Sequence, residues 1–199
     1  MTSFIRSGLS TIKQVLIPHS FQRKGFSTEK SLANYGFISG MAMPLVLFPN
    51  TIVLAFSSLL IPEFTEFNKR SEYLRMKRVS KKIIIYTLLF SITISIIILI
   101  FSKQLCYFMY KSLDVVIYVR LLAPLIPIMY LDSVVDAILK GLDQQVTVLK
   151  INILDSVTCI LLICSLIPIY GIAGYIFIIY FSEILNFALS FYTFKQTLH

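Results

Sequence analysis

The chain has 199 residues, of which 57% are hydrophobic and only 14% are charged, and its mean hydropathy is +0.82. In a soluble protein the formal net charge of +8 would suggest a nucleic-acid partner. Two charge-free apolar runs, however, each have the roughly 20 residues that cross a bilayer. The composition therefore predicts a membrane protein and argues against nucleic-acid binding.

Residues 1–35 precede the first of these runs. Ile5, Leu9, Ile12 and Leu16 recur at helical spacing, and a polar connector, PHSFQRKGFSTEKS, follows them. We expect either an amphipathic helix or the tail of a spanning helix whose beginning is missing. The stretch has no continuous apolar core of the kind that a signal peptide requires.

The rest of the chain predicts an all-α polytopic membrane bundle over residues 36–194. Runs of this length in lipid form helices, because every backbone amide must be satisfied within the segment. Two spans are free of charge and three carry one to three charged residues. The expected spans are about 36–61, 83–102, 115–139, 151–170 and 171–194, with a short tail at 195–199.

A basic loop at residues 63–82 connects the first two spans. It holds seven of the eighteen basic residues: Lys69, Arg70, Arg75, Lys77, Arg78, Lys81 and Lys82. The positive-inside rule makes this loop cytoplasmic in the plasma membrane, and threading the spans onward also makes the C-terminus cytoplasmic. The basic residues of 1–35 then lie outside, against the rule. The loop could also bind anionic lipid head groups, although topology alone accounts for its charge.

Charged residues within the third span are the most informative feature. Asp132, Asp136 and Lys140 share one helix face, because they are spaced four residues apart. A carboxylate at a helix centre is disfavoured in lipid by roughly 2.5–3.5 kcal/mol, so this face is expected to lie against the bundle interior or a water-filled cavity.

The last two spans carry polar residues at comparable depth. They are Asp155 in the fourth span, and Glu183 and Asn186 in the fifth. Two interpretations remain open. One is a structural hydrogen-bonded cluster in which Lys140 neutralises Asp136, and the other is a hydrated pathway for a polar substrate or a coupling ion.

Prolines interrupt two of the spans. Pro44 and Pro49 lie in the first, and Pro124 and Pro127 in the third. Each removes a helical hydrogen bond, so we expect kinks there. Kinked helices are common where transporters hinge or line cavities.

No enzyme, metal site or cofactor is predicted. The three cysteines and two histidines are not at zinc-ligand spacing, and no nucleophile has a partnered base. The Tyr-Asp and Gly-x-Gly-Asp motifs of intramembrane aspartyl proteases are not matched, because Leu131 separates Tyr130 from Asp132, and Gly141-Leu-Asp143 lacks the paired glycine.

An ordered series of segments resembles the C-terminal half of the stage V sporulation protein B family. This family is a branch of polysaccharide-type flippases within the multidrug/oligosaccharidyl-lipid/polysaccharide exporter superfamily. The segments are YGFISGMAMPLVLFPNTIVLAFSSLLIPEFTE before the basic loop, then LLAPLIPIMYLDSVVDAILKGLDQQ, INILDSV and IPIYGIAGYIFIIYFSEILN.

The resemblance implies a flippase-like carrier of lipid-linked glycan or peptidoglycan precursors, associated in spore formers with cortex synthesis. Its relatives have two six-helix lobes that rock about a central cavity. On that pattern this chain holds most of the second lobe, and the first lobe is absent. It would then be a fragment, a half-length subunit that assembles with a partner or with itself, or a non-functional remnant. The alternative of a different class is a non-transporting membrane scaffold.

Overall fold

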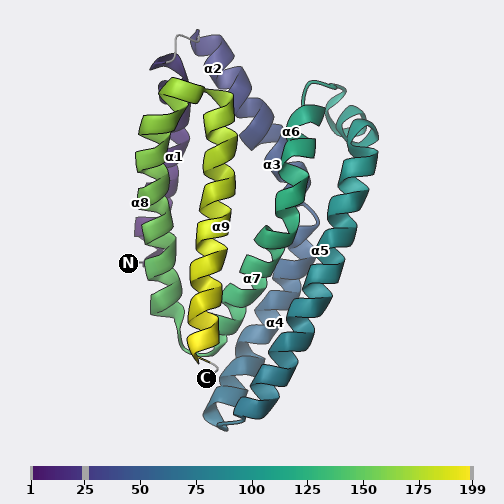
Figure 1. Cartoon of the computed structure of the whole chain (residues 1–199), viewed down its shortest axis with the longest axis vertical. Coiled ribbons are helices and arrows are strands. Elements are labelled where there is room, and N and C mark those ends of the chain that lie inside the picture. The colour runs from purple at the N-terminus through teal and green to yellow at the C-terminus, as the bar shows by residue number, and fades with distance from the viewer. Residues whose placement is uncertain (1, 24–26, 198–199) are drawn as a thin grey trace.

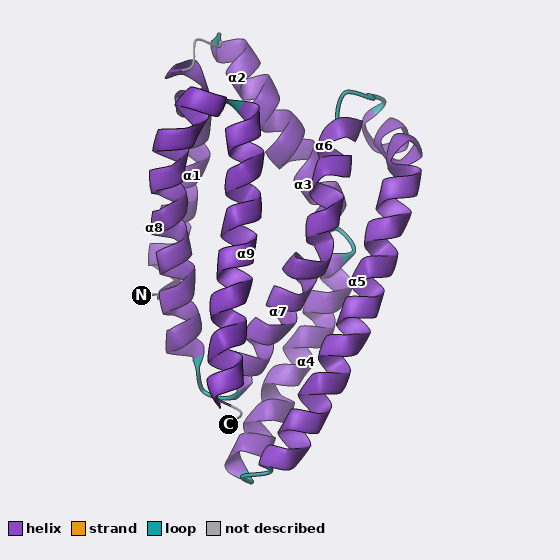
Figure 2. Ribbon diagram, in the orientation of Figure 1, coloured by secondary structure: helices purple, strands orange, loops and turns teal. Residues whose placement is uncertain are grey.

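The computed structural model describes residues 2–23 and 27–197, with the side chains of residues 2–7, 9, 10, 23 and 28 left out. The side chains of Ile5 and Leu9 therefore lie outside the described part. Every element within these ranges is a helix, as Figure 2 shows. The predicted all-α membrane bundle is confirmed.

The helices follow one another with short connections (Figure 1). They are α1 (Thr2–Arg23), α2 (Thr28–Tyr35), the π-helix η1 (Gly36–Ala42), α3 (Met43–Leu47), α4 (Asn50–Lys69), α5 (Tyr73–Tyr110), α6 (Val116–Leu122), the 3₁₀-helix η2 (Ala123–Leu125), α7 (Ile126–Gly141), α8 (Gln145–Tyr170) and α9 (Ile172–Thr197).

Within the described residues, four helices are long and apolar enough to cross a membrane. They are α5, the α6–α7 unit Val116–Gly141, α8 and α9. A fifth span is complete if the bent pair Glu29–Leu47 and Asn50–Lys69 crosses together. The helix α1 is not among these candidates, and it packs along α8 with Ile17 and Phe21 buried.

The first span is broken rather than continuous over 36–61. Its two parts meet at 58°, and Pro49 lies in the break between Leu47 and Asn50. The π-helix η1 ends directly before α3, in which Pro44 is an early residue. Hydropathy alone could not indicate this irregular course, because both parts of the span are equally apolar.

Tyrosines from neighbouring helices satisfy carbonyls of this broken span. The hydroxyl of the fully buried Tyr130 donates to the Val46 carbonyl at 3.0 Å. In a continuous helix that carbonyl would face the amide of Asn50, which instead begins α4. Tyr110 donates in the same way to the Met41 carbonyl at 3.0 Å. Side chains thus stabilise backbone that lipid could not hydrate.

The third span also changes course at its prolines. Pro124 lies in η2, and Pro127 is in the first turn of α7. Pro127 has no N–H to offer the Ala123 carbonyl four residues earlier. The Ile126 amide donates to that carbonyl within the 3₁₀ turn, and the Ser95 hydroxyl of α5 adds a second hydrogen bond at 2.8 Å.

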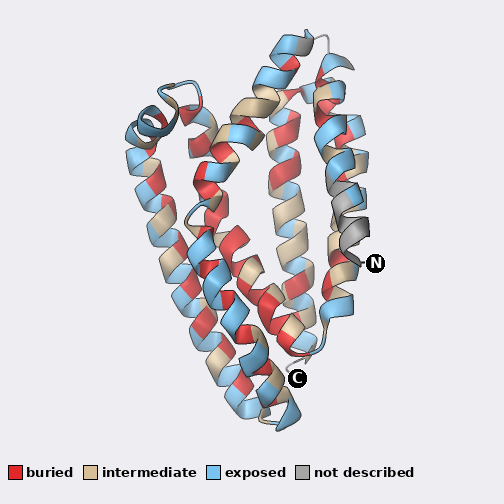
Figure 3. Ribbon diagram, turned by 180° about the vertical axis from the view of Figure 1, so that it is seen from behind, coloured by how far each residue is buried: buried red, intermediate tan, exposed pale blue. Residues whose placement is uncertain are grey.

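The α6–α7 unit is the centre of the bundle. It buries 61% of its most apolar stretch, whereas the other three long spans bury 22–28% of theirs. Helices α4 and α5 pack on one side of α7 and α9 on the other, while α8 and α1 lie beyond α9 and against each other (Figures 1 and 3). Charged residues on α7 are therefore placed inside protein.

Close packing of α4 on α7 depends on Gly141. A Cβ atom there would lie 2.6 Å from the Phe64 Cβ and 2.8 Å from the Ile61 carbonyl oxygen. A larger residue would separate the two helices, so this glycine holds α4 directly against the end of α7.

Candidate functional site

A polar cavity of about 560 Å³ lies where α1, α3, α4, α7, α8 and α9 converge. Its walls carry four carboxyl groups, two lysines and several amides and hydroxyls. The lining residues are Lys13, Met43, Leu47, Asn50, Leu54, Met129, Asp132, Ser133, Asp136, Lys140, Asn152, Asp155, Ser156, Ser182, Glu183 and Asn186. The cavity therefore gathers polar side chains from helices that are otherwise strongly apolar.

Asp155 of α8 ties three helices together at one end of the cavity. Lys13 of α1 places its Nζ 3.5 Å from Oδ2, and Ser182 of α9 donates to Oδ1 at 2.6 Å. The Lys13 and Asp155 side chains are only 23% and 13% exposed. Opposite charges in this setting compensate each other, and loss of either one would leave a costly unpaired ion.

Asp136 of α7 has partners on two sides. Ser190 of α9 donates to its Oδ1 at 3.1 Å. Lys140, one turn further along α7, places its Nζ 3.9 Å from Oδ2, and its side chain is 40% exposed. This proximity of Lys140 to Asp136 is what we expected if the polar residues form a structural hydrogen-bonded cluster. The exposed lysine contributes modestly, since water competes for its charge.

Asp132 is the most deeply buried carboxyl group of the cavity, with 9% of the residue exposed. Asn186 of α9 donates to its Oδ2 at 3.1 Å. The second oxygen, Oδ1, has no hydrogen-bond partner among the described residues. A buried carboxylate oxygen without a donor is unusual and costly.

Two further buried oxygens on the cavity wall also lack a hydrogen-bond partner among the described residues. The Asn50 amide donates through Nδ2 to Ser133 Oγ at 3.3 Å, and its Oδ1 has no partner within the described part of the chain. The Oδ1 of Asn186 is likewise unpartnered there. Four buried side-chain atoms of the described residues lack a partner, and three of them belong to lining residues. Buried acceptors around the cavity thus outnumber the donors that the described residues supply to them.

All six polar residues singled out from the sequence line this one cavity: Asp132, Asp136, Lys140, Asp155, Glu183 and Asn186. None of the four prolines does, but Met43, Leu47, Asn50 and Met129 lie next to the irregular backbone and do line it. The prolines themselves therefore do not line the cavity, whereas the neighbouring Asn50 contributes a polar side chain to its wall.

Sequence reasoning missed several lining residues. Lys13 belongs to a stretch that we expected outside the bundle, and its sequence gives no sign of a partner 142 residues away. Asn50 follows Pro49 directly, and an amide beside a helix-breaking proline is a signal that could have found it. Asn152, Ser156 and Ser182 are close in sequence to charged residues that were found.

The arrangement is suited to binding rather than to bond breaking. No described group of three or more His, Cys, Asp and Glu side chains is placed to hold a metal ion. Asp143, the aspartate of the rejected Gly-x-Gly-Asp match, is exposed in a turn and does not line the cavity. Carboxylates and amide oxygens together accept hydrogen bonds from hydroxyl, amide or ammonium groups, or bind a cation.

Two solved structures share this fold. One is a MOP superfamily transporter from Pyrococcus furiosus Vc1 whose binding pocket is described as having reverse polarity. It matches with a TM-score of 0.70 and 20% identity over 96% of this chain and 42% of its own. The other is an outward-facing multidrug resistance MATE family transporter of the MOP superfamily. It matches with a TM-score of 0.59 and 20% identity over 94% of this chain and 44% of its own.

Sequence comparison gives the same assignment. The stage V sporulation protein B of Bacillus subtilis (strain 168) is 23% identical over 163 residues, which is 80% of this chain and 31% of the relative. The chain thus spans less than half the length of each of these proteins. The MatE family model matches residues 25–164. The resemblance to the exporter superfamily is confirmed, and the chain belongs to the MatE family.

Proposed function

We propose that this chain is the second lobe of a flippase-type carrier, and that its polar cavity binds the hydroxyl-rich part of a lipid-linked glycan. We infer that polysaccharide or peptidoglycan precursors are the substrate class. In its most specific form, the proposal gives the carrier a role in spore cortex formation. Membership of the MatE family supports the carrier class. The name of the Bacillus subtilis relative, a sporulation protein, supports the link to spore formation.

The single observation that carries the proposal is the excess of buried acceptors. The Oδ1 atoms of Asn50, Asp132 and Asn186, which come from three helices around one cavity, have no donors in the described structure. Glycan hydroxyls and acetamido N–H groups are donors of the kind that these oxygens need. Recognition by many such groups is specific, because a ligand that lacks them leaves the acceptors unpaired.

The charge of the cavity indicates which part of the substrate it would receive. Four carboxyl groups face two lysines, and both lysines already have a carboxylate partner. Phosphate groups would be repelled by such a wall. The phosphate-bearing end of the lipid carrier is therefore expected to stay outside the cavity while the neutral sugars enter it.

A first lobe is also part of this proposal. The chain covers 42% and 44% of the two solved transporters, and one lobe alone cannot enclose a substrate on both sides. The first lobe is either covalently continuous with this chain or a separate partner subunit. We also propose that the basic loop 63–82 and the C-terminus are cytoplasmic in the plasma membrane, on the positive-inside rule.

The test is a flipping assay on the native assembly. The protein is isolated from its own membranes with whatever first lobe accompanies it, and it is reconstituted into vesicles with a fluorescent lipid-linked oligosaccharide. Quenching of the outer leaflet then measures the flipped fraction. Asp132→Asn removes the buried charge with little change in shape, and we expect the flipping rate to fall about tenfold or more.

Glu66→Gln is the matched control. This carboxylate pairs with Arg70 at 2.6 Å, both side chains are about 60% exposed, and neither residue lines the cavity. The control should flip at the unmodified rate. Equal rates in both variants would contradict a substrate role for the cavity. Absence of flipping by the unmodified assembly would favour the non-transporting scaffold.

A further inference from the structure

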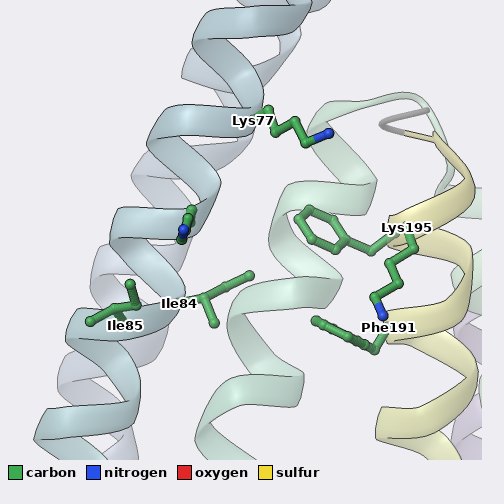
Figure 4. A pocket seen from close by; sticks show the side chains of 7 residues that line it. Lys77, Ile84, Ile85, Phe191 and Lys195 are labelled. Carbon is green, nitrogen blue, oxygen red and sulfur yellow. The ribbon is translucent and has the colours of Figure 1, made fainter.

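A second hollow of about 430 Å³ lies between α5 and α9, at the end of the bundle where α5 begins and α9 ends (Figures 1 and 4). It shares no lining residue with the polar cavity. We call it the basic groove. Its lining residues are Lys77, Lys81, Ile84, Ile85, Phe191, Phe194 and Lys195.

The groove is graded from charged to apolar along both walls. On α5, Lys77 and Lys81 come first, and Ile84 lies on the same face nearer the membrane centre. On α9, Phe191 precedes Lys195, which lies in the last helical turn. Figure 4 shows Lys77 reaching from α5 toward α9 across the groove. The charged end thus lies at the membrane surface and the apolar end at hydrocarbon depth.

The lysines of the groove differ from those of the cavity in their partners. Among the described residues, no carboxylate lies within 4.0 Å of Lys77, Lys81 or Lys195, whereas Lys13 and Lys140 each have one. Lys195 instead places its Nζ over the Phe191 ring at 5.2 Å. Three ammonium groups around one opening attract an anion strongly.

We propose that the basic groove binds one anionic phospholipid of the surrounding leaflet. The phosphate of its head group contacts the three lysines, and one acyl chain lies along Ile84, Ile85 and the two phenylalanines. The charge complements an anionic head group, and the order of charged and apolar surface matches the order of head group and chain in a bilayer. Each basic residue near an anionic membrane surface adds to such binding.

This inference is independent of the proposed carrier function, because it rests on a separate surface. It also explains an arrangement of lysines that membrane topology alone does not explain. Topology accounts for charge anywhere between residues 63 and 82. It does not account for the convergence of Lys77 and Lys81, which the structure places near the start of helix α5, with Lys195 of α9 around the basic groove.

Fluorescence quenching tests the proposal. This chain contains no tryptophan, so the signal of an introduced tryptophan is obtained by subtracting that of the unmodified assembly. Ile85→Trp places a reporter in the groove wall at a position that is 44% exposed. Ile100→Trp places a second reporter, in a separate protein, on an α5 surface that is 63% exposed and outside the groove. The native assembly is reconstituted with phosphatidylcholine and phosphatidylglycerol. The brominated chains are on phosphatidylcholine in one preparation and on phosphatidylglycerol in the other.

We expect brominated phosphatidylglycerol to quench the groove reporter in clear preference to brominated phosphatidylcholine, and to show no preference at the second reporter. Replacing Lys77, Lys81 and Lys195 by Gln should abolish the preference. Lys81→Gln alone should lower the relative affinity about fivefold. The matched control replaces Lys69, Arg78 and Lys82 by Gln, which removes the same charge from exposed residues outside the groove and should leave the preference intact.

Three results would overturn the proposal. Equal quenching by the two lipids at the groove reporter would mean that no anionic head group is selected. Quenching by neither lipid would mean that protein, such as the first lobe or a second copy, covers the groove. A fluorescence change of the groove reporter with inorganic phosphate, without selective quenching by brominated phosphatidylglycerol, would assign a soluble anion in place of a lipid.

Discussion

The two hollows of this molecule handle charge in opposite ways. In the polar cavity, carboxylates lie deep in the spans and receive partners from neighbouring helices, such as Lys13 and Ser182 for Asp155. In the basic groove, lysines lie at the helix ends and have no carboxylate partner among the described residues. Charge at mid-depth must be satisfied by protein, whereas charge at the surface can be left for water, lipid or ligand.

The largest effect is expected where the cavity is most tightly paired. Asp155→Leu leaves the Lys13 ammonium without its partner in a mostly buried wall, and we expect the free energy of unfolding to fall by about 3–5 kcal/mol. Unfolding in mixed micelles, followed by dye labelling of the buried Cys106, measures it.

The double variant Lys13→Met with Asp155→Leu provides the control. It removes both charges, so most of the lost stability should return. If the double variant is as unstable as the single one, the two residues are not coupled and the cavity is not held by this pair.

Packing between α4 and α7 should give the next largest effect. Gly141→Ala forces a Cβ against Phe64 and the Ile61 carbonyl, so stability should fall by roughly 2 kcal/mol. Because no groove residue belongs to α4 or α7, the lipid preference of the groove should not change. Gly40→Ala is the control, since nothing lies within 4 Å of a Cβ there, and a loss of equal size would refute the packing argument.

Tyr130→Phe removes the donor to the Val46 carbonyl at the break in the first span. We expect a loss of about 1.5 kcal/mol, because the buried carbonyl is left unsatisfied. The same unfolding measurement applies, and Tyr86→Phe, at a residue that is 68% exposed, should have no effect. Equal stability of Tyr130→Phe and the unmodified chain would show that the break does not need this contact.

The smallest effect is expected at the exposed lysines. Lys140→Met removes a partner of Asp136, but its side chain is 40% exposed, so we expect a change of about 0.5 kcal/mol that salt diminishes. Lys77→Gln should leave stability unchanged and alter only lipid selection. A large loss of stability from Lys77→Gln would place this lysine in the packing and contradict the contrast between the two hollows.

The sequence predicted the cavity better than the groove for a physical reason. A carboxylate in an apolar helix must face protein or water, so Asp132, Asp136, Asp155 and Glu183 could be grouped by depth alone. The basic stretch 63–82 drew attention to Lys77, but no sequence pattern connected it with Lys195, because lysines at helix ends are ordinary. Only the folded chain shows that they meet around one opening.

The irregular backbone was likewise only partly predictable from the sequence. Prolines indicated where the first and third spans deviate, since Pro removes a helical donor. The side-chain donors, Tyr130 and Ser95, come from other helices. No local pattern identifies such partners, just as none predicted that Lys13 of α1 reaches Asp155 of α8.

The central claim is that the cavity, and not the groove, receives the glycan. The most direct test compares Ser133→Cys, on the cavity wall, with Ile85→Cys, on the groove wall, in a chain whose three native cysteines are replaced by Ala. Labelling by a small hydrophilic thiol reagent is timed with and without a lipid-linked oligosaccharide. The account predicts that the glycan slows labelling of Ser133→Cys severalfold and leaves Ile85→Cys unchanged. Protection of Ile85→Cys alone, or of neither position, would contradict it.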